Sequence, residues 1–151
     1  MDVTIREQDG RRAIAVEVLS PPGDQRARAL ARHIERLDGR IHGYASPGSP
    51  ERTVVSLADV LLFEVSSQRV AIVLRDGREL ESPLRLFRLE EELEGTEFVR
   101  VSRQVIVNFD CVRGIRPEVG ARLVLELEGG RLEMVTRVYA PTIRKKLGME
   151  R

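Results

Sequence analysis

The sequence predicts a mainly β protein, α+β overall, and three observations lead to this fold class. From about residue 53 onward, apolar stretches of strand length, such as residues 60–65 and 70–74, follow one another at short intervals. Asp-Gly at 76–77 and Gly-Gly at 129–130 lie between such stretches, and these pairs favour tight hairpin turns. Helical periodicity is confined to one run before residue 40, one mid-chain run and one near the end.

Apolar alternation near the N-terminus predicts two strands followed by a helix. The strands fall at residues 3–5 and 13–18, with the turn pair Asp9-Gly10 between them. Asp24 stands at the N-cap position of an amphipathic helix. The apolar positions of this helix are Ala27, Leu30, Ala31, Ile34 and Leu37.

The chain is expected to divide after a linker. Residues 41–45 predict another short strand, and residues 46–50 contain two prolines and a glycine, which disfavour regular structure. Residues 1–50 would then be a small β-β-α-β segment with a dimerisation or sensing role. Residues 51–151 would form the main domain.

The main domain predicts short strands around one helix. We expect strands at residues 53–57, 60–65, 70–74, 78–81, 98–101, 105–108, 111–115, 123–127 and 132–135. Ser82-Pro83 is expected to open the helix, because proline is tolerated in a first turn, and Gly95 to end it. Pro141 is expected to start a last short helix over residues 142–147.

Composition limits the function classes. The 151 residues, 42% of them hydrophobic, suffice for one domain with a small appendage. Lys and Arg number 25 against 24 Asp and Glu, so nucleic-acid binding would need a local basic patch. The 4% aromatic content argues against stacking of unpaired bases. The charged N-terminus and strand-sized apolar runs favour a soluble, cytoplasmic protein over a secreted or membrane-spanning one.

No catalytic residue, metal site or cofactor is predicted, and we expect the protein not to be an enzyme. Two histidines and one cysteine cannot supply an ordinary zinc cage. His33 and His42 are expected at the surface or an interface, and Cys111 as a small core hydrophobe. The acidic run at residues 90–94 is expected to be a solvated helix face.

Charges in the main domain are sorted by sign. Residues 79–97 hold seven acids against two arginines, whereas residues 100–116 hold four arginines against Asp110. Residues 137–146 hold four basic residues and no acid. This sorting fits either a phosphate-contacting patch or solvated faces with cross-strand ion pairs.

The segment at residues 98–108 is the most informative one. A strand-like stretch breaks at Ser102-Arg103-Gln104 and then resumes. Arginine can donate two hydrogen bonds to guanine, and glutamine can pair with adenine. The alternative is an ordinary polar loop, and Asn108 is expected to satisfy turn backbone groups.

The order of these motifs resembles a LytTR-type DNA-binding domain. The resemblance rests on Ala58 to Glu64, on Asp76-Gly77, on the leucine-rich helix, on residues 98–108 and on residues 135–140, and it covers about 95 residues, 53–147. It implies stacked antiparallel β-sheets with a mid-domain helix and a short C-terminal helix. It also implies a transcriptional regulator that contacts the major grooves of double-stranded DNA through inter-strand loops.

The resemblance also implies which loops contact DNA. They are the polar break at 102–104, the loop at 66–69 and the basic position after residue 136. Together with nearby basic residues, the candidate DNA-binding set is Ser66, Ser67, Gln68, Arg69, Arg100, Ser102, Arg103, Gln104, Arg137, Arg144, Lys145 and Lys146. The chain departs from the family pattern at Ser102, where many members carry histidine, at the short loop after Glu64, at Val138 and at Pro141.

Residues 1–50 leave no room for a receiver domain, so the chain resembles the stand-alone, receiverless members. This implies a homodimer and a co-encoded membrane protein as candidate partners, with no small-molecule substrate. The alternative is a protein-interaction module that pairs with a membrane protein or with itself and lacks specific DNA recognition.

Overall fold

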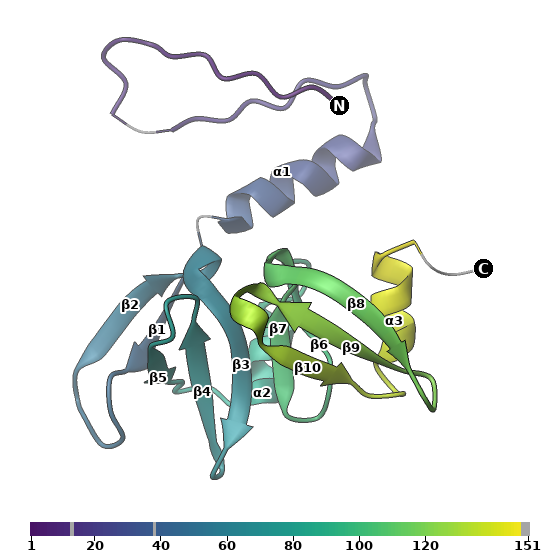
Figure 1. Cartoon of the computed structure of the whole chain (residues 1–151). Helices are drawn as coiled ribbons and strands as arrows, with labels where there is room; N and C mark the ends of the chain where they lie inside the picture. Colours follow the sequence, from purple (N-terminus) through teal and green to yellow (C-terminus); the bar gives the residue numbers. More distant parts are fainter. Residues whose placement is uncertain (13, 38, 149–151) are drawn as a thin grey trace.

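Two antiparallel sheets form the body of the protein (Figure 1). The computed structural model describes residues 1–12, 14–37 and 39–148. The larger sheet has seven strands in the order β2 (Arg52–Ser56), β1 (Arg40–Tyr44), β5 (Glu79–Glu81), β4 (Arg69–Leu74), β3 (Val60–Ser66), β7 (Val105–Asn108) and β6 (Phe98–Arg100). The smaller sheet has the order β10 (Leu132–Val135), β9 (Arg122–Leu127) and β8 (Val112–Glu118).

Three helices accompany the sheets: α1 (Gln25–Leu37), α2 (Leu86–Glu92) and α3 (Ala140–Lys146). The architecture confirms the predicted mainly β, α+β fold of stacked antiparallel sheets with a mid-domain and a C-terminal helix. No helix among the described residues has the length and apolar content needed to cross a bilayer.

Both faces of the larger sheet are buried, which explains its unbroken apolar strands. On one face, Leu62 and Val107 pack with the smaller sheet and with Ile143 of α3. On the other face, Phe63 and Ile106 pack with α2. Because neighbouring strand residues point to opposite faces, a strand covered on both sides needs apolar residues at successive positions.

The strand at residues 40–44 belongs to the larger sheet. It pairs with β2 over five residues and with β5 at Tyr44 and Glu81. Residues 46–50, expected to be a linker, are therefore part of the loop of the β1–β2 hairpin. Gly43 permits this close packing, since a Cβ there would lie 2.8 Å from the Cβ of Leu80. The division of the chain at residue 50 stays a prediction.

The two strands predicted at residues 3–5 and 13–18 are wrong for the described part of the chain, where residues 1–24 contain turns and no strand. Residue 13 lies outside the described residues. The turn at Asp9-Gly10 is present, with φ of 82° at Gly10 and a 3.4 Å hydrogen bond from Arg11 N to Gln8 O. An isolated hairpin is marginally stable in water, and the large apolar side chains Val3, Ile5, Ile14 and Val16 stay mostly exposed.

The helix starts follow local hydrogen bonds. Asp24 caps α1 as predicted, since its Oδ1 accepts from Arg26 N at 2.9 Å. The predicted opening of α2 at Ser82-Pro83 is wrong by a few residues. The buried Ser82 hydroxyl accepts from Leu84 N at 3.0 Å and donates to Leu84 O, so a turn comes first and Arg85 is the N-cap. Pro141 lies in the first turn of α3, as predicted.

Two side chains have the structural roles predicted for them. The buried Asn108 donates to Val60 O at 2.9 Å and accepts from Asp110 N, which joins β7 to β3. Cys111 is fully buried, and burial raises the pKa of its thiol. Its role is packing in the core between the sheets.

Candidate nucleic-acid interface

The β3–β4 hairpin presents the first candidate loop, Ser66 to Arg69. Ser66 pairs with Arg69, so the connection is a two-residue turn of Ser67 and Gln68. Both turn residues have positive φ, 52° and 64°, as a type I′ turn requires. All four side chains are exposed. The tight turn therefore presents short polar side chains and one arginine at the end of a buried strand pair.

The β6–β7 connection presents the second loop, Ser102 to Gln104. Val101 N donates to Val105 O at 3.0 Å, and Ser102 Oγ accepts from Gln104 N at 3.2 Å. These bonds close the loop tightly, and Arg103 and Gln104 are left exposed. Their side chains are the ones whose chemistry suits base edges.

Arg100 organises this loop from within. Its Nε donates to Ser102 O at 2.6 Å, and its Nη2 donates to Arg103 O at 2.5 Å. Its Nη1 donates to Glu90 of α2 at 2.7 Å, and only 16% of the side chain is exposed. A guanidinium with all three nitrogens engaged in this way holds the loop in shape, so the structure places Arg100 behind the candidate surface.

The third segment, Thr136 to Val138, follows β10. Thr136 N donates to Val101 O at 3.0 Å, one residue before the second loop. Arg137 and Val138 are exposed, and the Tyr139 ring lies 6.0 Å from the Arg100 guanidinium. Arg137 is therefore held beside Ser102 to Gln104 although more than thirty positions separate them in sequence.

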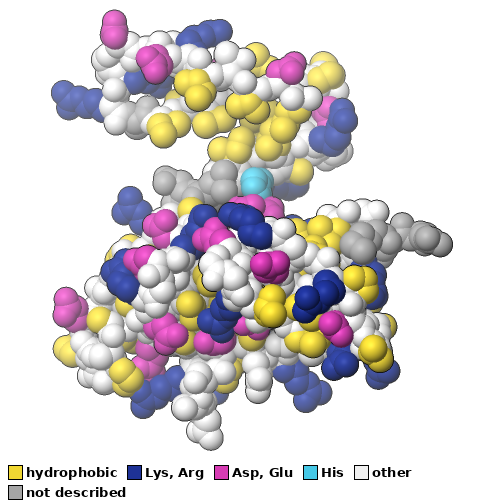
Figure 2. Space-filling model, viewed as in Figure 1, with side chains coloured by type: hydrophobic (Ala, Val, Ile, Leu, Met, Phe, Trp, Pro, Cys, Tyr) yellow, Lys and Arg dark blue, Asp and Glu magenta, His cyan; other side chains and the backbone are white. Residues whose placement is uncertain are grey.

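One hydrogen bond joins the first two loops. Gln104 O accepts from Val65 N at 2.9 Å, immediately before the β3–β4 turn. With the Thr136–Val101 bond, this sets the three segments side by side along one edge of the domain, the lower edge in Figure 1. We call this edge the three-loop edge. Its three segments contain Arg69, Arg103 and Arg137 and no acidic residue, although Glu81 of β5 lies 3.6 Å from Arg69. Figure 2 shows basic side chains along this edge.

The basic C-terminal residues are not all at this edge. Lys146 lies 3.4 Å from Glu97 and 5.2 Å from the centre of the Phe109 ring. Glu97 and Phe109 lie at the ends of β6 and β7 opposite to the Ser102–Gln104 loop. Lys145 is exposed and Arg144 is half-buried on the same short helix. The structure thus places Lys146 away from the three-loop edge.

Two arginine–carboxylate clusters join the two sheets of the domain. Arg131 donates to Glu64 at 2.6 Å and to Glu133 at 2.9 Å, which joins the two sheets. Burial lowers the pKa of Arg131, but the hydrogen bond to Glu133 and the charge of Glu64 outweigh it, so the pKa is raised overall. The two sheets are therefore joined by charge-assisted bonds as well as by the apolar core.

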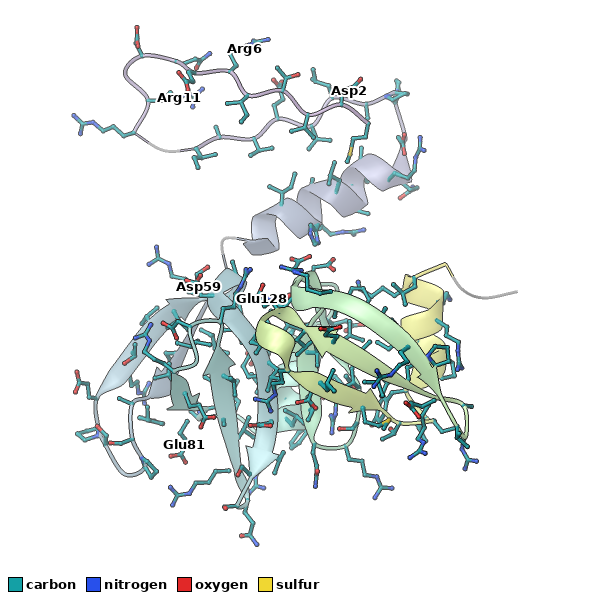
Figure 3. All side chains as sticks on the ribbon, in the orientation of Figure 1. Asp2, Arg6, Arg11, Asp59, Glu81 and Glu128 are labelled. Carbon is teal, nitrogen blue, oxygen red and sulfur yellow. The ribbon has the colours of Figure 1, made fainter. Side chains whose placement is uncertain are left out.

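A second cluster lies at the opposite edge (Figure 3). Arg75 donates to both oxygens of Glu128, at 2.5 and 2.8 Å, and Arg113 donates to Glu128 at 2.9 Å. The Arg75 hydrogen bond holds the pKa of Glu128 below its usual 4.5.

Sequence reasoning missed two contributors to this site. Glu90, expected to be solvated, pairs with Arg100 and so supports the loop. Val138, noted only as a departure from a family pattern, is 79% exposed beside Arg137. The acid-rich helix gave no sign of the first contact, because it depends on how α2 packs on β6. The exposure of Val138 could have been suspected from the sequence, because this apolar residue follows Arg137 in a segment between a strand and a helix.

Comparison with known proteins agrees with this fold. A family model of the LytTr DNA-binding domain matches residues 51–148. A Staphylococcus aureus protein described as an uncharacterized HTH-type transcriptional regulator is 22% identical over 134 residues, covering 89% of each chain. A solved LytTr DNA-binding domain from Bacillus cereus has a TM-score of 0.63 at 22% identity and covers 73% of this chain and 99% of its own, which shows a shared fold. Because the family model spans more than half of the chain, this protein belongs to the LytTR family and is a DNA-binding transcriptional regulator.

Proposed function

We propose that this regulator reads the major groove of double-stranded DNA with its three-loop edge. The observation that carries the proposal is the pair of backbone bonds, Gln104 O to Val65 N and Thr136 N to Val101 O, that aligns the three segments. Loops fixed to a rigid sheet can enter a groove with little loss of conformational entropy. The absence of acidic residues within the three segments suits a surface that approaches phosphates.

Each exposed side chain has a role that its chemistry suggests. Arg103 donates to guanine O6 and N7, and Gln104 pairs with adenine. Arg137 and Arg69 contact bases or phosphates on either side, and the hydroxyls of Ser66, Ser67 and Ser102 with the Gln68 amide add hydrogen bonds. Arg100 positions the loop.

Arg144 and Lys145 contribute long-range attraction to phosphate, and Lys146 contributes less because Glu97 partly neutralises it. Because the ligand is genomic DNA, the protein acts in the cytoplasm. It acts as a homodimer, so two three-loop edges address two half-sites. A co-encoded membrane protein is the proposed regulatory partner.

Fluorescence anisotropy of the full chain on duplex DNA from immediately upstream of its own gene tests the proposal. A scrambled duplex is titrated in parallel, both across a salt series. We expect Arg103→Ala to weaken specific binding by about 1–3 kcal/mol and to relax the preference at one base pair. Arg78→Ala is the matched control, since Arg78 is 67% exposed in the β4–β5 turn, at the opposite end of β4 from Arg69.

The outcomes separate the alternatives. An unchanged specific affinity of Arg103→Ala would remove that loop from the interface. If both duplexes bind equally weakly, the next step is selection from random duplexes. If that selection yields no preferred sequence, the proposal of sequence-specific DNA binding is wrong. Absence of binding at low salt would favour the protein-interaction module.

A further inference from the structure

The N-terminal arm, residues 1–20, carries large apolar side chains that nothing covers. Val3, Ile5, Ile14, Val16 and Leu19 are 60% to 95% exposed. Figure 2 shows hydrophobic side chains along the side of the arm that faces α1. Scattered exposed hydrophobic residues are ordinary, but a contiguous group on one segment marks an interaction surface.

Pairing of the two limbs of the arm would bring four of these side chains to one face. The backbone of the arm runs out and back around the Asp9-Gly10 turn (Figure 1). If the two limbs pair around this two-residue turn, Ile5 lies opposite Ile14 and Val3 lies opposite Val16, all on one face. The intervening residues then point to the other face. Arg6 projects away from α1 in Figure 3.

The arm and α1 cannot complete a core by themselves. Among the described residues 1–24, the two backbone hydrogen bonds both lie in turns, Arg11 N to Gln8 O and Asp24 N to Pro21 O. The helix offers Leu30 and Ile34 as large aliphatic side chains, and both are already half-buried. Units below about 40 residues usually need oligomerisation, a metal or disulfides to fold.

We propose that the arm, with the adjoining face of α1, is the interface with a second copy of this chain. This rests on the homodimer that forms part of the proposed function and locates its contact surface. Five aliphatic side chains correspond to roughly 300–600 Å² of apolar surface per protomer. That is the apolar share expected of a standard interface of about 800 Å² per partner.

Charge favours a protein partner over a lipid surface. The arm holds three arginines, at positions 6, 11 and 12, and four carboxylates, at positions 2, 7, 9 and 17. Segments that lie on anionic membranes are instead strongly basic on their polar face. Glu7 would lie opposite Arg12 if the two limbs paired, which suits pairing within the arm.

The position of the arm also suits this role. It lies beyond α1, at the end of the molecule opposite to the three-loop edge (Figure 1). The helix is tied to the domain by His33, 3.5 Å from Glu97, and the adjoining chain by a 2.9 Å bond from Leu57 N to Gly39 O. Dimerisation through the arm therefore leaves both DNA-reading edges uncovered.

Sedimentation equilibrium of the full chain tests the interface. We expect the wild type to have twice its chain mass of 17.1 kDa at micromolar concentration. The double variant Ile5→Arg/Ile14→Arg should be monomeric, with dimerisation weakened at least about 100-fold. The matched control is Val54→Arg/Phe87→Arg, which changes apolar residues of the main domain that are also mostly exposed, at 61% and 57%. It should dimerise as the wild type does.

Three results would overturn the proposal. One is a wild type that stays monomeric up to about 100 µM, far above the dissociation constant of a standard interface. Another is a double variant that still dimerises. The third is a monomeric wild type that pellets with phosphatidylglycerol vesicles and is released by the double substitution, which would make a membrane the occupant.

DNA binding supplies an independent measurement. The double variant should bind a one-site duplex as the wild type does and should lose the additional affinity for a two-site duplex. If the wild type dimerises but no form binds DNA, the proposed function fails and the interface stands. If all forms bind one site equally and the wild type is monomeric, the interface fails and the proposed function stands.

Discussion

The N-terminal arm and the β3–β4 hairpin are both apolar limbs around a tight turn, and they have different fates. Each has two apolar limbs joined by a tight two-residue turn. In β3–β4 the limbs pair fully, and Val60, Leu62 and Phe63 lose all solvent exposure. In the arm the limbs stay unpaired, and Ile14 is 95% exposed. Apolar limbs around a turn thus form strands where other layers cover them, because an isolated hairpin gains too little from burial.

Shortening an apolar side chain should lower the free energy of unfolding far more in the β3–β4 hairpin than in the arm, and this is the largest expected difference. Phe63→Ala should lower the free energy of unfolding by about 3–5 kcal/mol, because it removes a fully buried ring that packs on Phe98. The same measurement on Ile14→Ala, by urea denaturation at a concentration that keeps the chain monomeric, should show a change below about 0.5 kcal/mol. A large loss of stability in Ile14→Ala would mean that the arm packs within its own chain.

Arg100→Ala should lower both stability and specific DNA affinity, each by about 1–3 kcal/mol, because the loop carbonyls and Glu90 lose their donor. Arg103→Ala should lower affinity alone, since its side chain is exposed. Thermal unfolding and anisotropy on the same samples make this distinction. Arg100→Lys should not restore affinity, because an ammonium cannot reproduce the planar fork. Full affinity in Arg100→Ala would show that the loop keeps its shape unaided.

Exposed apolar residues are expected to contact protein in the N-terminal arm and DNA at the three-loop edge. Val138, which is 79% exposed, tests the second of these expectations. We expect Val138 to contact a thymine methyl group, so Val138→Ala should weaken binding by about 1 kcal/mol. Replacing thymines one at a time with deoxyuridine removes the methyl group from the DNA side. Replacement at one position should weaken DNA binding by the wild type and leave the affinity of Val138→Ala unchanged. Equal losses in both proteins at every position would exclude the contact.

The pH dependence of stability should show the smallest effect. The Arg75 hydrogen bond lowers the pKa of Glu128 in the folded protein below the 4.5 of the unfolded chain. The stabilisation is therefore present above pH 4.5 and is lost as the pH falls through the folded-state value. Glu128→Gln should flatten this part of the plot of unfolding free energy against pH, by less than about 1 kcal/mol. Urea denaturation across a pH series measures it. A wild-type profile that Glu128→Gln leaves unaltered would assign the acid sensitivity to other carboxylates.

Most strands of the main domain could be predicted because their signals are local. The Asp76-Gly77 turn is an example, since Gly77 has φ of 91° and Asp76 Oδ1 accepts from Arg78 N at 3.0 Å. The Asp24 cap and the polar break at Ser102 to Gln104 are local in the same sense. The residues of the candidate loops were identified through their resemblance to a family, and their juxtaposition was not predictable from spacing.

What the sequence by itself determined was most of the elements from α1 onward, because periodicity, turn residues and caps act over a few positions. What only the tertiary structure decided was which surfaces meet. The pairing of Tyr44 with Glu81 and the inward role of Arg100 both depend on how separate elements pack together. So does the alignment of the three loops through Val65 and Val101. Hydrogen bonds and burial are properties of neighbours in space, and an isolated stretch of sequence does not specify those neighbours.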